Sequence, residues 1–152
     1  MLQLNNLSRL RPILCVAIFA LALAVSGCSI KLISSYDETT DKTVTALQKK
    51  TEAHLVVLEA VDGLPGCKYE KHKQFYDEAK VDVSAIAVRA AAIPKNEITT
   101  EQTILLSNSL YDLEKLHKIA CLSKDQIGHL RTQFNSSFTA ILKLELAKRR
   151  GE

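Results

Sequence analysis

The chain has 152 residues, a length typical of one domain, and a net charge of +3. Once the first 27 residues are set aside, 18 basic residues face 17 acidic ones, and the remaining charge of +1 argues against a nucleic-acid interface. Trp is absent and aromatic residues make up 5% of the chain, which argues against stacking surfaces for bases or sugars. No nucleotide-binding loop, nucleophile elbow or HExxH motif occurs, so we expect no enzyme.

The N-terminal segment has the organisation of a secretory signal peptide. Arg9 and Arg11 precede residues 12–25, in which every residue is apolar or proline. This stretch of about 14 residues is shorter than the roughly 20 residues of a transmembrane helix. A basic start, a short apolar segment and small residues after it predict a signal peptide over residues 1–27.

The sequence Val25-Ser26-Gly27-Cys28 resembles the lipobox of bacterial lipoproteins. The resemblance implies that a diacylglyceryl group is attached to the Cys28 thiol, that residues 1–27 are removed and that the new amine is acylated. Ser29 follows in place of Asp, which by analogy implies sorting to the outer membrane, facing the periplasm. Residues 28–36 would then form a lipidated tether. The alternatives are an ordinary signal peptide or an uncleaved anchor helix.

The first predicted helix runs from about residue 37 to residue 61. Its apolar face has helical spacing. The Gly and Pro residues of residues 62–66 end it, because they favour a turn. The predicted face consists of Val44, Leu47, Thr51, Leu55 and Leu58.

The second predicted helix runs from about residue 69 to Ile93. Its inward positions alternate in steps of three and four, as in helices that pack lengthwise. Pro94 ends the helix, since the residue before a proline is disfavoured in the helical region. The inward positions are Tyr69, His72, Tyr76, Ala79, Val83, Ile86, Ala90 and Ile93.

Two further helices are predicted from capping boxes. Thr99 with Gln102 predicts the start of the third helix, and Ser123 with Gln126 predicts the start of the fourth. The third has an apolar stripe of Leu106, Leu110, Leu113, Leu116 and Ala120. The fourth has an inner face of Ile127, Leu130, Phe134, Phe138, Ile141 and Leu144.

Short connections between these segments predict an all-α fold, an antiparallel up-down bundle of about four helices over residues 37–152. The competing architecture is a looser three-helix core with the first helix partly detached. In the bundle, Cys67 and Cys121 flank loops at the same end. Because disulfides persist in exported proteins, we expect these two cysteines to pair. A redox-active pair is the alternative, although no CxxC motif occurs.

His72, Glu114 and His117 form the candidate metal site. The spacing Glu114-x-x-His117 matches half of the carboxylate motif of di-iron bundles, which needs two such motifs. No CxxCH haem-attachment motif occurs, and the one Met is at position 1. The histidines are therefore expected to be boundary residues with a polar tip in water, and no cofactor is expected.

Lys148, Arg149 and Arg150 end the last helix at the end of the bundle from which the tether would leave. They are expected either to contact anionic lipid headgroups or to form a solubilising tail. Together these features predict a membrane-anchored envelope lipoprotein that acts as a non-catalytic helical binding or scaffolding module. Its partners would be the membrane lipid, reached through Cys28, and an unknown envelope protein. The alternative function is a metal- or haem-binding bundle.

Overall fold

The computed structural model describes residues 33–151 of the chain. The predicted signal peptide (residues 1–27), the predicted lipidation site Cys28 and the first residues of the tether lie outside the described residues. The described part belongs to one compact unit, Ile33–Glu152. None of its helices is both long enough and apolar enough to cross a membrane.

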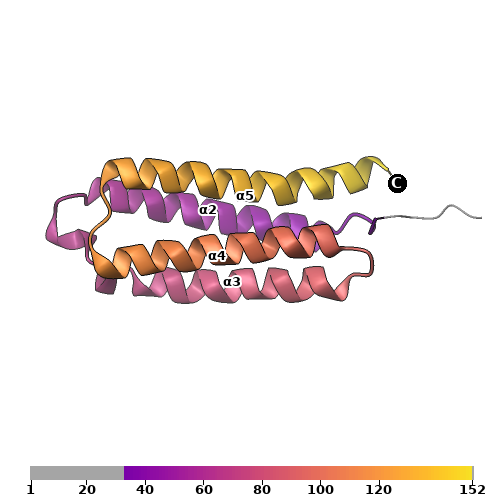
Figure 1. The fold of residues 1–152 in the computed structure, drawn as a ribbon, viewed down its shortest axis with the longest axis horizontal. Coiled ribbons are helices and arrows are strands. Elements are labelled where there is room, and N and C mark those ends of the chain that lie inside the picture. The colour runs from indigo at the N-terminus through magenta and orange to yellow at the C-terminus, as the bar shows by residue number, and fades with distance from the viewer. Residues whose placement is uncertain (1–32, 152) are drawn as a thin grey trace, which may run out of the picture. The chain divides into compact units, whose positions relative to one another are not determined.

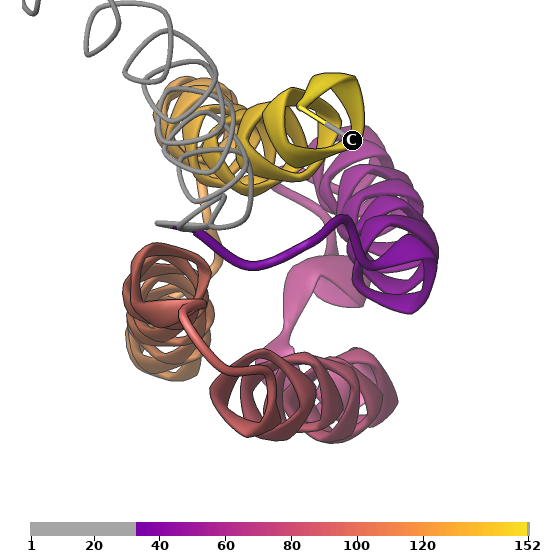
Figure 2. The same cartoon turned by 90° about the vertical axis from the view of Figure 1, so that its right-hand side faces the viewer.

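Over residues 33–151 the fold is all-helical and consists of four long helices (Figure 1). Each long helix packs against two neighbours: α2 and α4 both contact α3 and α5, as the end-on view shows (Figure 2). The predicted antiparallel bundle is therefore confirmed. The helices are α2 (Glu38–Ala60), α3 (Lys73–Ala92), α4 (Glu97–Ile119) and α5 (Lys124–Arg150), with two short 3-10 helices, η1 (Pro65–Cys67) and η2 (Tyr69–Lys71), between α2 and α3.

Helices α2 and α5 begin where the sequence predicts. The Asp37 side chain caps α2 by accepting a hydrogen bond from the backbone N–H of Thr40 at 2.9 Å. Ser123 and Gln126 form the predicted capping box of α5, each side chain bonding the other residue's backbone N–H. Because these caps use partners within three residues, the local sequence determines them.

Helix α3 begins four residues later than predicted. Residues Tyr69–Lys71 form the separate 3-10 helix η2, and the backbone at His72 is not helical. The inward positions from Tyr76 to Ala90 are buried as predicted. The first turn of the predicted helix is therefore part of the connection that carries Cys67.

Helix α4 begins at Glu97, so the predicted capping box at Thr99 and Gln102 is wrong. Thr99 lies inside the first turn, where it is buried and bonds to α5. At the other end Leu116 is 42% exposed, and His117 is buried in its place. The buried face of α4 therefore includes the polar residues Thr99 and His117. The apolar pattern had predicted that Leu116, not His117, faces the core.

The core is apolar in its middle and polar towards both ends of the bundle. In α5 the buried stripe continues past Ile141 to Glu145 and Lys148, whereas the predicted Leu144 is only half-buried. At the opposite end, His54, Tyr76 and His117 occupy core positions. These two polar clusters contain most of the side chains from which a functional site can be built.

Candidate functional site at the disulfide end

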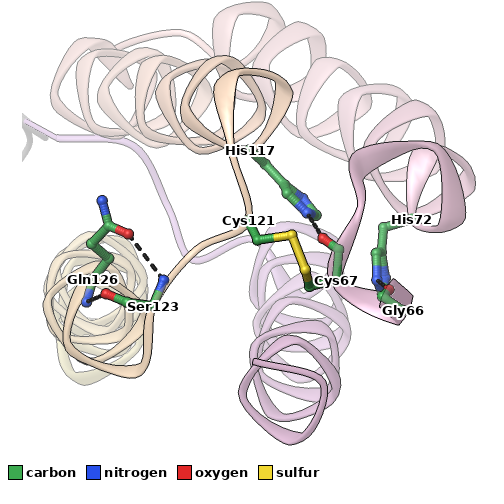
Figure 3. The surroundings of a disulfide bond; sticks show 7 residues. All are labelled: Gly66, Cys67, His72, His117, Cys121, Ser123 and Gln126. Atoms are coloured by element: carbon green, nitrogen blue, oxygen red, sulfur yellow. Dashed lines mark hydrogen bonds between the residues drawn. A yellow bond between two sulfur atoms is a disulfide. The ribbon is translucent and has the colours of Figure 1, made fainter. Parts of the chain in front are cut away.

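A disulfide joins Cys67 and Cys121, as predicted, and links η1 to the segment that follows α4 (Figure 3). The two Cα atoms are 5.4 Å apart, within the usual range for a disulfide. The bond spans 54 residues of sequence. Closing a loop of this length in the unfolded chain corresponds to about 4 kcal/mol of stabilisation by the chain-entropy model.

A directed chain of hydrogen bonds connects three buried side chains to this disulfide. A carbonyl oxygen can only accept, so Nε2 of His117 donates to the Cys67 carbonyl, at 2.6 Å. Nδ1 of neutral His117 is then an acceptor, and the Tyr76 hydroxyl donates to it at 2.7 Å. Since the only Tyr76 hydroxyl proton is used there, Nε2 of His54 donates to the Tyr76 oxygen, at 3.3 Å. The partners thus fix the tautomers of both histidines.

The three hydrogen-bonded side chains, His54, Tyr76 and His117, are all neutral at pH 7. Burial lowers the pKa of His54 to about 3, and the nearby His72 and His117 add to this effect. Burial also lowers the pKa of His117, against the opposing effect of its bond to the Cys67 carbonyl. Burial raises the pKa of Tyr76. These hydrogen-bonded side chains therefore carry no net charge. Their structural effect is to hold the α2–α3 connection, which contains Cys67, in place.

His72 also binds the α2–α3 connection, one residue before Cys67. Its Nε2 donates to the carbonyl oxygen of Gly66 at 2.9 Å (Figure 3). The carbonyl groups of two consecutive residues, Gly66 and Cys67, are thus each bound by a histidine. The turn at η1 is fixed by a covalent bond and by two imidazole donors.

Glu114 does not join the histidines in a metal site. Its carboxylate accepts from the Tyr69 hydroxyl at 2.8 Å and lies 2.9 Å from the ammonium groups of Lys80 and Lys118. Burial alone would raise the pKa of Glu114, but these three donors outweigh it and lower the pKa to about 2. The carboxylate is therefore compensated by protein cations.

The prediction that His72, Glu114 and His117 together bind a metal ion is therefore wrong. Both ring nitrogens of His117 are committed, to Tyr76 and to the Cys67 carbonyl. Within residues 33–151 no group of three or more His, Cys, Asp or Glu side chains is placed to hold a metal ion. The predicted spacing places Glu114 and His117 on neighbouring turns of α4, but they bind different partners.

The opposite end of the bundle contains a buried ion pair. Lys148 is only 7% exposed, and its ammonium donates to the Glu145 carboxylate, to Asn96 at 2.6 Å and to Thr99 at 2.9 Å. Lys148 therefore fits neither alternative expected for the basic tail, headgroup contact or a solubilising end, because its charge is paired inside the bundle. Of the three predicted tail cations, Arg149 and Arg150 are exposed.

The same polar cluster holds the first described residues of the chain. Ser34 donates from its backbone N–H to the Lys95 carbonyl and from its hydroxyl to Asn96, both at 2.9 Å. The backbone N–H of Asp37 donates to Glu145 at 3.1 Å. The predicted tether, residues 28–36, is thus attached to the bundle from Ser34 onward.

The solvent-facing side of α3 contains a row of apolar residues, next to Lys80, Ser84 and Arg89. Val81 and Val88 are each 69% exposed, and Ala85 and Ala92 lie exposed between and after them at helical spacing. Ile104 and Tyr111 of the neighbouring helix α4 are exposed as well. We call the four α3 residues the α3 outer stripe; they line an open groove along this helix.

No protein-family model, no curated protein and no solved structure matches this chain. The sequence predicted that Cys67 and Cys121 lie at one end of the bundle and offered His72 and His117 as candidate ligands. It did not predict the central role of Tyr76. The available signal was its place in the heptad pattern directly after His72, at an inward position where a tyrosine hydroxyl needs a hydrogen-bond partner.

Proposed function

We propose that this protein is a lipid-anchored, non-catalytic binding module of the bacterial envelope, and that it holds an envelope protein against the α3 outer stripe. The observation that carries the proposal is the two-sided apolar character of α3. The inner face of α3 is apolar and packs against α2 and α4, whereas the outer stripe is a second apolar surface of the same helix that stays exposed. Contiguous exposed apolar residues on a folded domain commonly mark a site of protein–protein contact.

The charged residues of α3 next to the stripe are already engaged. Asp82 pairs with Lys50 of α2 at 2.6 Å, and Arg89 pairs with Asp37 through two contacts of 2.6 Å. Both side chains are thus held in contacts with other parts of the bundle, and Val81 and Val88 of the stripe remain exposed. Small side chains such as Ala85 allow a second helix to approach closely, so an amphipathic helix laid along α3 is the kind of partner that this surface fits.

The lipid anchor would keep this surface close to the membrane. If Cys28 carries lipid, four residues separate it from Ile33, and the five residue-to-residue steps span at most about 18 Å. The bundle itself is about 40 Å long, from the 27 residues of α5 at 1.5 Å each. The anchor would therefore confine α3 to a shallow layer and raise its effective concentration towards other proteins of that membrane.

The two halves of the proposal have separate tests. Mass spectrometry of protein purified from membranes should find the chain beginning at an acylated Cys28, and Cys28→Ala should leave the protein unacylated and release it from membranes. An unmodified Cys28 in the wild-type protein would contradict the anchor.

For the binding surface, a photo-crosslinking residue at position 88 in living cells should give one discrete adduct. The same residue at Ser136, exposed on α5, should not give it. Val81→Asp should abolish the adduct without lowering the unfolding temperature, because Val81 lies outside the core. Equal adducts from positions 88 and 136, or an adduct that survives Val81→Asp, would contradict a role for the stripe.

A further inference from the structure

An open groove of about 360 Å³ lies between α2 and α3, next to the disulfide end. Its walls include His54 and Val57 of α2, together with His72, Phe75 and Glu78. The groove is on a different part of α3 from the outer stripe. It contains two histidines whose hydrogen bonds account for only one nitrogen each.

The first of these is His54, which is only 6% exposed. Its Nε2 donates to Tyr76, so Nδ1 carries a lone pair and no proton. No hydrogen bond to Nδ1 exists within residues 33–151. Because every fully buried side-chain N or O atom of the described chain has a partner, this nitrogen must reach the surface, and the groove is the opening beside it. The imidazole also stacks on Phe75, with ring centres 3.7 Å apart, which fixes its orientation.

The second is His72, which is half-buried. Its Nε2 donates to the Gly66 carbonyl, so its Nδ1 also carries a lone pair when the ring is neutral (Figure 3). The structure gives this Nδ1 no partner in the described part of the chain. The centres of the two imidazole rings are 5.3 Å apart, with the rings inclined at 67°.

We propose that His54 and His72 form a two-histidine site for a divalent transition-metal ion such as Cu²⁺ or Zn²⁺. Histidines that bind metals commonly donate their other N–H to a carbonyl or another acceptor, which fixes the tautomer, and both histidines do so here. With metal–nitrogen distances of about 2 Å and a tetrahedral angle, two ligand rings have their centres about 5 Å apart. Water completes the coordination, since the groove is open.

The charges beside the groove act in opposite directions on an incoming cation. The ammonium of Lys50 is offset by Glu78 at 3.3 Å and by Asp82 at 2.6 Å. Lys71 is exposed and has no ion pair within residues 33–151, so it opposes the incoming ion.

The test uses the full chain in detergent with Cys15→Ser and Cys28→Ser, which removes competing thiols. Calorimetric titration with Cu²⁺ should give one equivalent, and electron paramagnetic resonance should show two imidazole nitrogens. His72→Gln keeps a donor for the Gly66 carbonyl but removes the ligand, so it should weaken binding at least tenfold. His129→Gln, at an exposed histidine of α5, is the matched control and should change nothing. Lys71→Gln should tighten binding.

Equal Cu²⁺ affinities for the parent and for His72→Gln would overturn the proposal. A second measurement avoids any folding effect of the substitution. In the ¹⁵N-labelled parent, Zn²⁺ should shift the Nδ1 signals of His54 and His72 and leave those of His117 in place. Shifts confined to His129, or no shift at all, would also overturn it. The outcome is independent of the lipid anchor and of the α3 outer stripe.

Discussion

His117 of α4 donates a hydrogen bond to the carbonyl oxygen of Cys67, 2.6 Å away and 50 residues earlier in the chain. The disulfide from Cys67 to Cys121 joins the same two regions covalently. The α2–α3 connection is therefore tied to the end of α4 through both the backbone and the side chain of one residue. This double attachment makes the stability of the bundle sensitive to a few buried polar atoms.

Tyr76→Phe should destabilise the protein by about 1–3 kcal/mol, because it leaves Nδ1 of His117 and Nε2 of His54 without their partner inside the core. Urea unfolding followed by circular dichroism measures the change. Tyr111→Phe removes the same hydroxyl from an exposed position and should have no measurable effect. Similar losses in the two variants would show that the buried hydrogen bonds of Tyr76 do not contribute to the free energy of unfolding.

Reducing the disulfide should lower the free energy of unfolding by about 4 kcal/mol, the value expected for a loop of this length. Urea unfolding with and without dithiothreitol gives the difference. In the double variant Cys67→Ala, Cys121→Ala the reductant should have no effect. If the wild-type protein also unfolds identically in both conditions, the two cysteines are not bonded in solution.

Stability should fall as the pH is lowered from 6.5 to 5. The folded pKa of His54 is about 3 and that of the unfolded side chain is 6.5, so in this range the unfolded state binds a proton that the folded state does not. The contribution is complete above pH 6.5 and is lost by up to about 1.4 kcal/mol per pH unit. Burial gives His117 a pKa shift in the same direction.

The pH effect can be assigned with one substitution. His54→Gln retains a donor for Tyr76 and cannot be protonated, so its unfolding free energy should depend less on pH than that of the wild-type protein. His129→Gln should keep the wild-type dependence. Measurements stay above pH 5, because Glu114, with a folded pKa of about 2 and an ordinary value of 4.5, adds its own loss of stability in more acidic solution.

Lys148→Met should destabilise the bundle by about 3–5 kcal/mol, because it leaves the Glu145 carboxylate buried without a cation. Adding Glu145→Gln should recover at least half of the loss, since the amide keeps an acceptor for the backbone N–H of Asp37. Arg150→Ala, two residues away and exposed, should change stability by less than about 0.5 kcal/mol. A loss in Lys148→Met no larger than in Arg150→Ala would contradict a structural role for the pair.

The local features of the fold could be predicted from the sequence. The heptad spacing from Tyr76 to Ala90 identified the buried face of α3, and the Ser123–Gln126 capping box located the start of α5. Both depend on residues close together in the chain. The topology then followed from the short connections, and it placed the two cysteines at the same end.

The polar core residues could not be predicted in this way. His117, Glu145 and Lys148 continue the three- and four-residue spacing of their helices, but an apolar criterion excludes them. Their burial is tolerated because they form hydrogen bonds, for example to Cys67 and Asn96. These partners lie about 50 residues away in the sequence. Only the three-dimensional arrangement reveals those partners.

The attachment of Ser34 to Lys95 and Asn96 also determines how the bundle responds to mechanical load. Tension on the chain ahead of Ser34 acts first on the α3–α4 turn, and through Asn96 and Lys148 it reaches α5. Because Ser34 lies three residues before Asp37, the cap of α2, these contacts should take up the load before it reaches the first turn of α2. A pull on the N-terminal segment is therefore shared among three helices, so the bundle should resist extraction forces better than a helix loaded at its own end.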